Sequence, residues 1–544
     1  MNEIVRGLRP ARTDGADGVV LGHVEAVSGG GARIRLDRQG LALLAGDDDG
    51  ALAMGGEVGS MLAMSVAGRN VIATVHALDC DGDSVIAHLA FLGEGERDAA
   101  GHLSGFRRGV TRFPLPGTPV TGVSTPDMDA IFGAREIPNI EVGTVHPTRS
   151  TRAALHVDAM LSKHFALLGS TGTGKSTATA LILHRICAMA PHGHIVMIDP
   201  HGEYAAAFDA VGASYGVANL AMPYWLMNFE EHCEVLLTTS GAERQTDADI
   251  LAKCLLAARQ RNRAAEGVSR ITVDSPIPYV LSDLTTIIQT EMGKLEKASS
   301  NAPYLRLKHK IDEIRSDPRY HFMFSGMLVG DSMKSFIKRI FRLPGEDRPI
   351  SVIDVSGVPS EITSVVVSVL ARCVFDYAIW ARNTAQHPIL LVCEEAHRYV
   401  PSDRQQNSGP VRRILERIAK EGRKYGVSLG LVTQRPSDLA EGVLSQCGTI
   451  IAMRLNNERD QAFVRAAMPE GARGFLDTIP ALRNREAIIC GEGVPIPIRV
   501  AFDDLAPELR PASHDPLFSE LWKRGGNEDA LVEQIIGRWR NQGR

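Results

Sequence analysis

LLGSTGTGKST, residues 167–177, ends an apolar run and opens a segment of helical spacing. From Gly169 to Ser176 it matches G-x-x-x-x-G-K-[ST], the P-loop pattern, and a strand before and a helix after are the context that this pattern requires. Gly172 and Gly174 permit positive φ and let the backbone approach a phosphate closely. The sequence therefore predicts a nucleotide-binding α/β domain rather than a glycine-rich turn that only begins a helix.

Each part of this phosphate cradle has a predicted role. Backbone N–H groups around Thr171 to Ser176 act with the helix N-terminus as an anion site. Lys175 supplies a positive charge to the β- and γ-phosphate oxygens, and Ser176 supplies a hydroxyl ligand to Mg²⁺. ATP and Mg²⁺ are thus the predicted cofactors. The residues predicted to bind the nucleotide here are Gly169, Ser170, Thr171, Gly172, Thr173, Gly174, Lys175, Ser176 and Thr177.

A pair of acids follows a second apolar run in ILLVCEEAHRY, residues 389–399. Consecutive residues of an extended strand point to opposite sides, so one carboxylate can face the metal and the other the attacking water. We assign Glu394 to Mg²⁺ and Glu395 to water activation, and the reverse assignment stays open. The alternative is a solvated pair of acids that caps the following helix.

Three further polar groups follow or precede strands of the same kind. In LGLVTQRP, residues 429–436, Gln434 can reach the γ-phosphate or orient water, unless it is only a turn amide. In VMIDPHGEY, residues 196–204, His201 is expected to be a turn residue, and Glu203 is an open candidate near the site. RIAKEGRKYGV, residues 417–427, is basic and fits either an arginine finger for a neighbouring subunit or a solvated helix face.

Composition limits the classes of partner. The chain of 544 residues has a net charge of −5 and a pI near 6.4, so any contact with DNA has to be confined to a small basic region. Aromatic residues make up only 5%, which argues against a stacking platform for single strands. The eight cysteines form no C-x-x-C motif and are expected to be buried thiols. With no apolar leader and no apolar run of about 18 residues, we expect a cytoplasmic protein without a membrane span.

The pattern of apolar and polar residues along the chain predicts several domains. Short alternating strands with glycine-rich turns predict a small β-barrel in residues 1–125, and the Pro- and Gly-rich residues 112–127 are expected to serve as a linker. Continuous apolar runs predict a mostly parallel, doubly wound α/β sheet in residues 126–223 and 346–510. Residues 224–345 have helical spacing and are expected to form an insertion, and residues 511–544 a helical tail.

Taken in order, LLGSTGTGKST, IDPHGEY, LVCEEAHRYVP, AKEGRKYGV and VTQRPSDL resemble the HerA branch of the HerA/FtsK superfamily of DNA-translocating ATPases. The resemblance covers most of the chain and implies a RecA-like core, a HAS-barrel and a homohexameric ring with double-stranded DNA in its pore. It makes Arg423 the arginine finger acting in trans. Lys163, just before the cradle strand, matches a basic position that contacts phosphates. Glu394 stands where ATPases more usually carry Asp, which leaves its division of roles with Glu395 open.

The family resemblance also implies a partner that docks on the N-terminal barrel, either a NurA-like nuclease or a sirtuin-like NADase or other effector of anti-phage defence. Our main hypothesis is an ATP-driven DNA translocase or helicase. The alternatives are a ring scaffold that activates an effector without translocation and, less favoured, a peptide unfoldase. The basic clusters to test for a pore role, each also consistent with a solvated surface, are Arg404, Arg412 and Arg413, and Arg306, Lys308 and Lys310.

Overall fold

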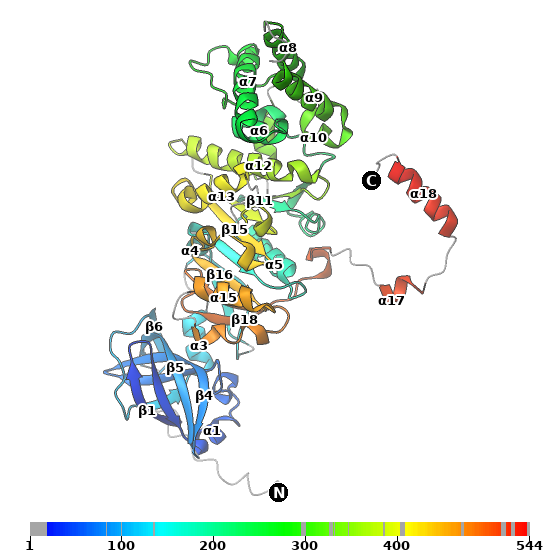
Figure 1. Ribbon diagram of the computed structural model, residues 1–544. Helices are drawn as coiled ribbons and strands as arrows, with labels where there is room; N and C mark the ends of the chain where they lie inside the picture. The colour runs from blue at the N-terminus through cyan, green and yellow to red at the C-terminus, as the bar shows by residue number, and fades with distance from the viewer. Residues whose placement is uncertain are drawn as a thin grey trace.

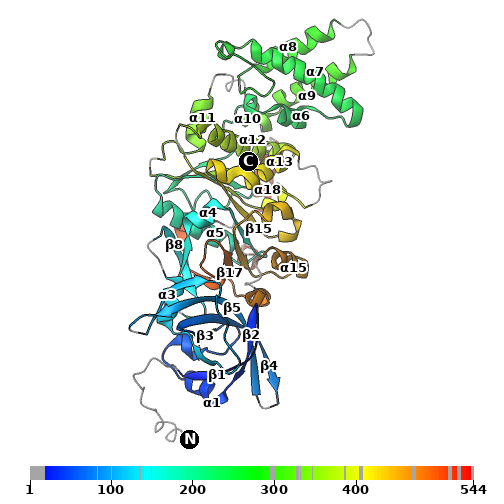
Figure 2. The ribbon, with the colours of Figure 1, turned by 90° about the vertical axis from the view of Figure 1, so that its left-hand side faces the viewer.

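The protein is represented by a computed structural model. It describes residues 19–82, 84–99, 101–133, 137–148, 150–294, 301–325, 330, 332–345, 347–384, 387–402, 409–468, 473–512, 518–523 and 528–540. A β-barrel lies at one end, a large sheet with its helices occupies the middle, and a bundle of helices lies at the other end (Figures 1 and 2). The fold class predicted from the sequence, a small barrel followed by an α/β domain, is confirmed.

The barrel is an antiparallel sheet that closes on itself. Its strands are β1 (Val20–Ser28), β2 (Gly31–Leu36), β3 (Met61–Val66), β4 (Arg69–Asp81), β5 (Ser84–Arg97), β6 (Leu103–Arg108) and β7 (Pro119–Gly122), with the short helices α1 (Arg38–Leu44) and α2 (Gly50–Ala53) between β2 and β3. The order β2-β1-β7-β3-β4-β5 is closed by pairing of β2 with β5, and β6 extends from β5. Closure removes the exposed edges that an open sheet would present.

The expected linker is partly wrong, because its second half contains β7. This strand pairs antiparallel with both β1 and β3 and so completes the barrel wall. Pro119 is the first residue of β7, a place where a strand tolerates the missing N–H. The following helix, α3 (Thr125–Phe132), is capped reciprocally by Ser124 and Asp127.

The central sheet carries the predicted α/β architecture. Its strands, in spatial order, are β12 (Gly212–Tyr215), β13 (Ile350–Asp354), β11 (His194–Asp199), β14 (Ile389–Cys393), β15 (Val427–Thr433), β10 (Phe165–Leu168), β16 (Thr449–Met453), β17 (Glu486–Gly491), β18 (Ile498–Phe502), β8 (Asn139–Val145) and β9 (Arg152–His156). From β12 to β16 neighbouring strands are parallel, and from β16 onward they are antiparallel. Every residue of β10, β14, β15 and β16 is buried, as in a sheet covered on both faces.

Helices alternate with these strands along the chain. They are α4 (Val157–Ser162), α5 (Lys175–Met189), α12 (Ser360–Ala381), α13 (Gly409–Glu421), α14 (Glu441–Leu444), α15 (Glu458–Ala467) and α16 (Arg473–Leu476). Among the described residues, α12 is the one helix long and apolar enough to cross a membrane, with a mean hydropathy of 1.7, contrary to the expectation that no such run exists. Two thirds of that segment is buried against the rest of the protein, as in the core helix of a globular domain.

The insertion is helical, as its spacing suggested, and stands beyond α12 (Figure 1). It contains α6 (Phe229–Leu236), α7 (Gly241–Gln260), α8 (Leu281–Met292), α9 (Ala302–Ser316), α10 (His321–Phe324) and α11 (Met333–Ile340). Buried Glu231 on α6 accepts hydrogen bonds from Ser368 and Arg372 on α12, which fixes the insertion to the core. A paired and hydrogen-bonded charge of this kind is costly to break.

The basic residues considered for a DNA pore are paired with acids in the described part of the chain. Arg306 forms a salt bridge with buried Asp247 at 2.8 Å, and the pairs Lys308–Asp312, Lys310–Glu313, Arg412–Glu416 and Arg413–Glu230 account for the other four. These contacts favour structural and solvated roles for the two clusters. Arg404 lies outside the described residues.

The C-terminal tail forms α17 (Phe518–Leu521) and α18 (Glu528–Arg540), which stand apart from the body of the protein in Figure 1. Trp522 and Trp539 on this tail are 81% and 75% exposed. All eight cysteines are free, as expected, although Cys80 is exposed and Cys233 is only partly buried.

Candidate functional site

The P-loop and the acid pair meet at one edge of the central sheet. Parallel strands end at the same edge, and β15 lies between the cradle strand β10 and the acid strand β14. The segments after these three strands therefore lie side by side: the cradle after Leu168, Gln434 after Thr433, and Glu394 after Cys393. We call this the carboxyl edge of the sheet. Ligands of open α/β sheets bind outside the carboxyl ends of their strands.

The cradle has the backbone that the sequence predicted. Gly172 and Gly174 have φ of 77° and 98°, in the left-handed region that glycine tolerates, and Gly174 is the N-cap of α5. Thr173 is fully buried and its hydroxyl donates to the Ser170 carbonyl at 2.8 Å. Lys175 is only 8% exposed. The loop is thus folded in the form that presents its N–H groups to a phosphate.

Two residues that the sequence did not single out hold this loop from the side. The Ser170 N–H donates to the Arg454 carbonyl at 2.9 Å, and the Arg485 N–H donates to the Thr173 carbonyl at 2.9 Å. Arg485 has a left-handed φ of 65°, and its guanidinium pairs with Asp504 at 2.7 Å. Because both contacts to the loop use the backbone, no side-chain pattern in the sequence signals them.

The two acids are buried beside the cradle, at 4% exposure for Glu394 and 5% for Glu395. The expectation that both belong to an extended strand is wrong, because β14 ends at Cys393 and Glu395 adopts a left-handed φ of 50°. For a residue other than glycine this conformation is strained, and such strain clusters at functional sites. The bend, rather than strand alternation, separates the two carboxylates.

Glu394 Oε2 is buried without a hydrogen-bond partner, whereas the buried Oε2 of Glu395 has His397 Nδ1 3.2 Å away. Buried acceptors are normally satisfied, so Glu394 Oε2 marks a place where a ligand, ion or water belongs. Carboxylate oxygens are the ligands that Mg²⁺ prefers, and Mg²⁺ typically takes only one or two of them together with phosphates and water. Within the described ranges no cluster of three or more His, Cys, Asp or Glu has a metal-binding arrangement. The residues present therefore fit a nucleotide-bound Mg²⁺ and not a metal caged by protein alone.

The environment drives the pKa values of the two acids apart. Burial raises the pKa of Glu394 to about 8, against the opposing charge of Lys175 and with the added repulsion of Glu395 and Asp199. Burial also acts to raise the pKa of Glu395, but the hydrogen bond and charge of His397, with Lys175 and His201, bring its net pKa below the usual value. Two carboxyl groups with pKa values pushed apart are typical of a site that divides acid–base and charge-binding roles.

Two histidines for which the sequence predicted no catalytic role contact the Glu395 carboxylate. His397 Nδ1 lies 3.2 Å from Glu395 Oε2 and 2.9 Å from the Thr433 hydroxyl, and His201 Nε2 lies 3.9 Å from Glu395 Oε1. Asp199, fully buried, accepts from the N–H groups of His201, Gly202 and Tyr204 and so forms the turn after β11. His201 is therefore more than a turn residue, because it also faces the acid predicted to activate water.

Gln434 lies between the two halves of this site. Its side-chain oxygen accepts a hydrogen bond from the Thr171 hydroxyl of the cradle. A nucleotide γ-phosphate would enter beside this contact, so the amide is placed to sense or orient what binds there.

Lys163 and Arg423 lie at the opposite edge of the sheet, which we call the amino edge. Lys163 precedes β10 and Arg423 precedes β15, whereas the cradle and Gln434 follow those strands. The seven residues of β15 alone span about 23 Å. Neither cation therefore reaches the cradle of its own chain, and binding of a nucleotide by Lys163 or Arg423 needs the cradle of another copy. Arg423 is exposed and borders a groove of about 620 Å³.

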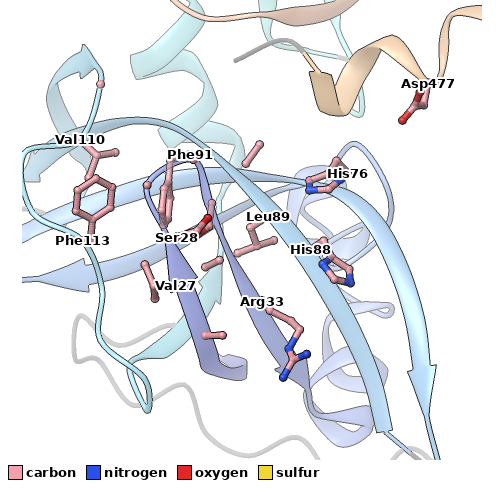
Figure 3. Close-up of a pocket in the computed structure, with 17 residues that line it drawn as sticks. Val27, Ser28, Arg33, His76, His88, Leu89, Phe91, Val110, Phe113 and Asp477 are labelled. Atoms are coloured by element: carbon pink, nitrogen blue, oxygen red, sulfur yellow. The ribbon is translucent and has the colours of Figure 1, made fainter. Parts of the chain in front are cut away.

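The barrel carries a separate cleft of about 770 Å³, distinct from the cradle (Figure 3). It lies between the β1–β2 hairpin, β5 and the loop after β6, and Asp477 of the α/β domain faces its rim near His76 (Figure 3). Its larger side chains are Val27, Arg33, His76, His88, Phe91 and Phe113.

Comparison with known proteins gives consistent matches. Residues 140–374 match the family described as "Helicase HerA, central domain". The "DNA double-strand break repair helicase HerA" of Pyrococcus furiosus is 27% identical over 397 residues, which cover 66% of this chain and 69% of that protein. The "Probable DNA double-strand break repair helicase HerA" of Methanocaldococcus jannaschii is 26% identical over 475 residues, covering 81% and 90%. VirB4 of Thermoanaerobacter pseudethanolicus superposes with a TM-score of 0.50 at 16% identity, over 69% of this chain and 99% of that structure, and shares the fold.

Proposed function

Because this chain is a HerA-type P-loop ATPase, we propose that it forms a homohexameric ring around double-stranded DNA and hydrolyses ATP between neighbouring copies to move that DNA. One observation carries the proposal. The carboxyl edge holds a complete cradle with two buried acids, while Lys163 and Arg423 stand at the other edge, out of reach of that cradle. A ring places the amino edge of one copy against the carboxyl edge of the next.

In this reaction the cradle binds the triphosphate through its N–H groups and Lys175, and Ser176 with Glu394 would hold Mg²⁺. The metal, when bound, neutralises charge on the β- and γ-phosphates. Glu394 would have to be ionised to hold the metal, although burial raises its pKa. Glu395, whose pKa is lowered, is ionised at neutral pH and can accept the proton of the attacking water. Gln434 orients that water or the γ-phosphate.

The finger contributes from the neighbouring copy. Arg423 stabilises the charge that develops on the transferred phosphoryl group, an effect worth about 10³- to 10⁵-fold in rate. Its exposure fits this role, since a finger has to leave its own surface to enter another site. Hydrolysis is then coupled to contact between copies, which is what moves a DNA strand in steps without reading its bases.

The mixing of two inactive variants tests this arrangement. Glu395→Gln leaves a cradle that binds ATP but cannot activate water, and Arg423→Ala leaves a subunit that cannot complete its neighbour. In an equimolar mixture an R423A cradle meets an E395Q finger at about one quarter of the interfaces, so turnover should return to about a quarter of the wild-type rate. Turnover that stays at the level of the separate variants, or an R423A protein as active as wild type, overturns the proposal.

A partner effector would dock on the barrel, whose cleft combines apolar walls with His76, His88 and Arg33. We propose a NurA-like nuclease for DNA end processing, or a sirtuin-like NADase or other effector for anti-phage defence, in this position. Co-purification with each class, with Phe113→Asp as the variant of the cleft, distinguishes them. The variant should lose the partner while keeping DNA-stimulated ATP turnover.

The same cleft also favours a second function, a ring scaffold that activates its effector without translocation. Glu395→Gln separates the two functions, because it keeps ATP-bound rings but stops hydrolysis. Loss of both translocation and effector activation supports the motor, whereas effector activation that persists in this variant supports the scaffold. Stimulation of turnover by double-stranded DNA and not by unfolded protein excludes a peptide unfoldase.

A further inference from the structure

The amino edge contains a cluster of charges whose centre is an acid, Glu492, that no part of the proposed reaction uses. Glu492 directly follows β17, and because β17 is antiparallel to β16 it lies beside the start of that strand, at the same edge as Lys163. Its Oε1 lies 2.8 Å from the Lys163 Nζ. We call Glu492, Lys163, Arg423 and Arg108 the amino-edge cluster.

The backbones of Glu492 and Lys163 are fixed relative to each other. Gly448 donates its N–H to the Lys163 carbonyl at 2.6 Å and accepts from the Glu492 N–H at 2.8 Å. A Cβ at Gly448 would lie 2.6 Å from the Lys163 Cβ, so only glycine allows the approach. The pair is therefore held by its main chain, although the side chains are 40% and 54% exposed.

Three cations from three different elements act on this one carboxylate. The hydrogen bond from Lys163, followed by the charges of Lys163, Arg108 and Arg423, lowers the pKa of Glu492 despite some burial. Arg108 ends β6 of the barrel, and its charge also acts on Cys490 near the end of β17. The barrel thus brings a cation to the edge that carries the proposed finger.

An isolated pair of exposed charges is worth little for stability. What such a pair can do is set the position of flexible side chains, because three like charges would otherwise repel one another into solvent. The cluster has three positive charges and one negative, so it remains complementary to a further anion.

Building on the trans arrangement proposed above, we propose that Glu492 is a positioning residue that holds Lys163, with Arg423 and Arg108 beside it, in the arrangement that receives the triphosphate bound by a neighbouring copy. Arg108 is on this view a third cation supplied in trans, and it comes from the barrel. The triphosphate completes the cluster when two copies meet, and the barrel takes part in that contact. Correct placement of groups before reaction is a large source of rate in such sites.

The test uses the full-length protein and steady-state ATP turnover with double-stranded DNA. Glu492→Gln keeps the shape of an exposed side chain and should lower kcat about five- to tenfold with KM for ATP changed less than twofold, since the cradle is untouched. Glu492→Asp should recover part of that loss. Arg108→Ala should lower kcat, while Arg107→Ala, its neighbour on the opposite face of β6, should leave it unchanged.

A double-mutant cycle shows whether Glu492 acts through Lys163. In a Lys163→Ala background, Glu492→Gln should change kcat less than twofold, because the group it positions is gone. Losses that simply multiply, or a wild-type kcat for Glu492→Gln or for Arg108→Ala, overturn the inference. If Arg423→Ala is inactive while Glu492→Gln is fully active, only this inference fails; if Arg423→Ala is itself fully active, the trans site fails as well.

Discussion

The two edges of the central sheet differ in how far their functional side chains are buried and held by contacts within one chain. At the carboxyl edge Thr173, Lys175, Glu394 and Glu395 are all under 10% exposed, and hydrogen bonds join Thr173 to Ser170 and the cradle to Gln434. At the amino edge Lys163 and Glu492 are about half exposed, and Arg423 is exposed as well. The buried groups of the carboxyl edge are positioned by a single chain. The exposed cations of the amino edge are placed to act on the nucleotide of another chain.

The carboxyl edge is nevertheless incomplete in one specific respect. Glu394 Oε2 is buried without a partner, and Glu395 holds a strained backbone conformation. Both features cost stability and are retained where a bound group repays them. Nucleotide with Mg²⁺ would supply partners for the buried acids of the carboxyl edge, and its triphosphate would supply the anion that the cations of a neighbouring amino edge bind. The comparison thus predicts that nucleotide binding and contact between copies strengthen each other.

The largest effect should come from the carboxyl edge, with Lys175→Ala. Removing a buried charge that faces developing negative charge should lower kcat about 10²- to 10³-fold and weaken ATP binding. Steady-state turnover and titration with a fluorescent ATP analogue measure the two effects. Lys420→Ala, on the exposed face of α13, is the matched control and should behave as wild type. A Lys175→Ala protein that retains both binding and turnover would mean that the cradle is not the nucleotide site.

Much of the carboxyl edge was predictable because its signals are local. The P-loop, the acid pair and Gln434 each sit directly after an apolar run, and parallel strands bring such positions together. The division of the acids was predicted for the wrong reason, since a left-handed Glu395 rather than strand alternation separates them. No propensity of glutamate indicates such a conformation; only the surrounding fold imposes it.

The remaining parts were hidden because they depend on distant backbone contacts. Arg454 and Arg485 support the cradle through main-chain atoms some 300 residues away in the sequence, where side-chain identity carries no signal. The sequence predicts a linker where the short strand β7 lies, because Pro119 and neighbouring glycines outweigh its β pattern. Pairing with a strand on each side makes this segment a strand. The sequence does not indicate Glu492 for a similar reason. Its role depends on contacts with Gly448 and Lys163, which are distant in the chain, and not on its sequence neighbours.

An intermediate effect should appear in the pH dependence of the carboxyl edge. His397 lowers the pKa of Glu395 through a hydrogen bond and its charge, so His397→Phe should raise that pKa. A smaller fraction of Glu395 is then ionised at a given acidic pH, and the acid limb of the kcat/KM profile should move to higher pH. Profiles measured from about pH 3.5 to 8 include the acid limb and show the shift. His201→Ala should move the limb less, because His201 is 3.9 Å from the carboxylate. An unmoved limb, or one displaced to lower pH, would contradict Glu395 as the base.

The smallest effect should come from Asp477, which links the carboxyl edge to the barrel. The segment between β16 and β17 bonds the cradle through Arg454 and Arg485, and its Asp477 pairs with Arg465 at 3.1 Å and faces His76 at the barrel cleft (Figure 3). Asp477→Asn removes an exposed charge, so a change of about twofold in KM for ATP with kcat unchanged is expected. Asp79→Asn, which loses a contact of 2.9 Å to His88 within the barrel alone, should leave KM as in wild type. If Asp477→Asn and Asp79→Asn change KM equally, the segment between β16 and β17 does not couple the barrel to the cradle. Of the two connections proposed above, only the amino-edge cluster would then link the barrel to an ATP site.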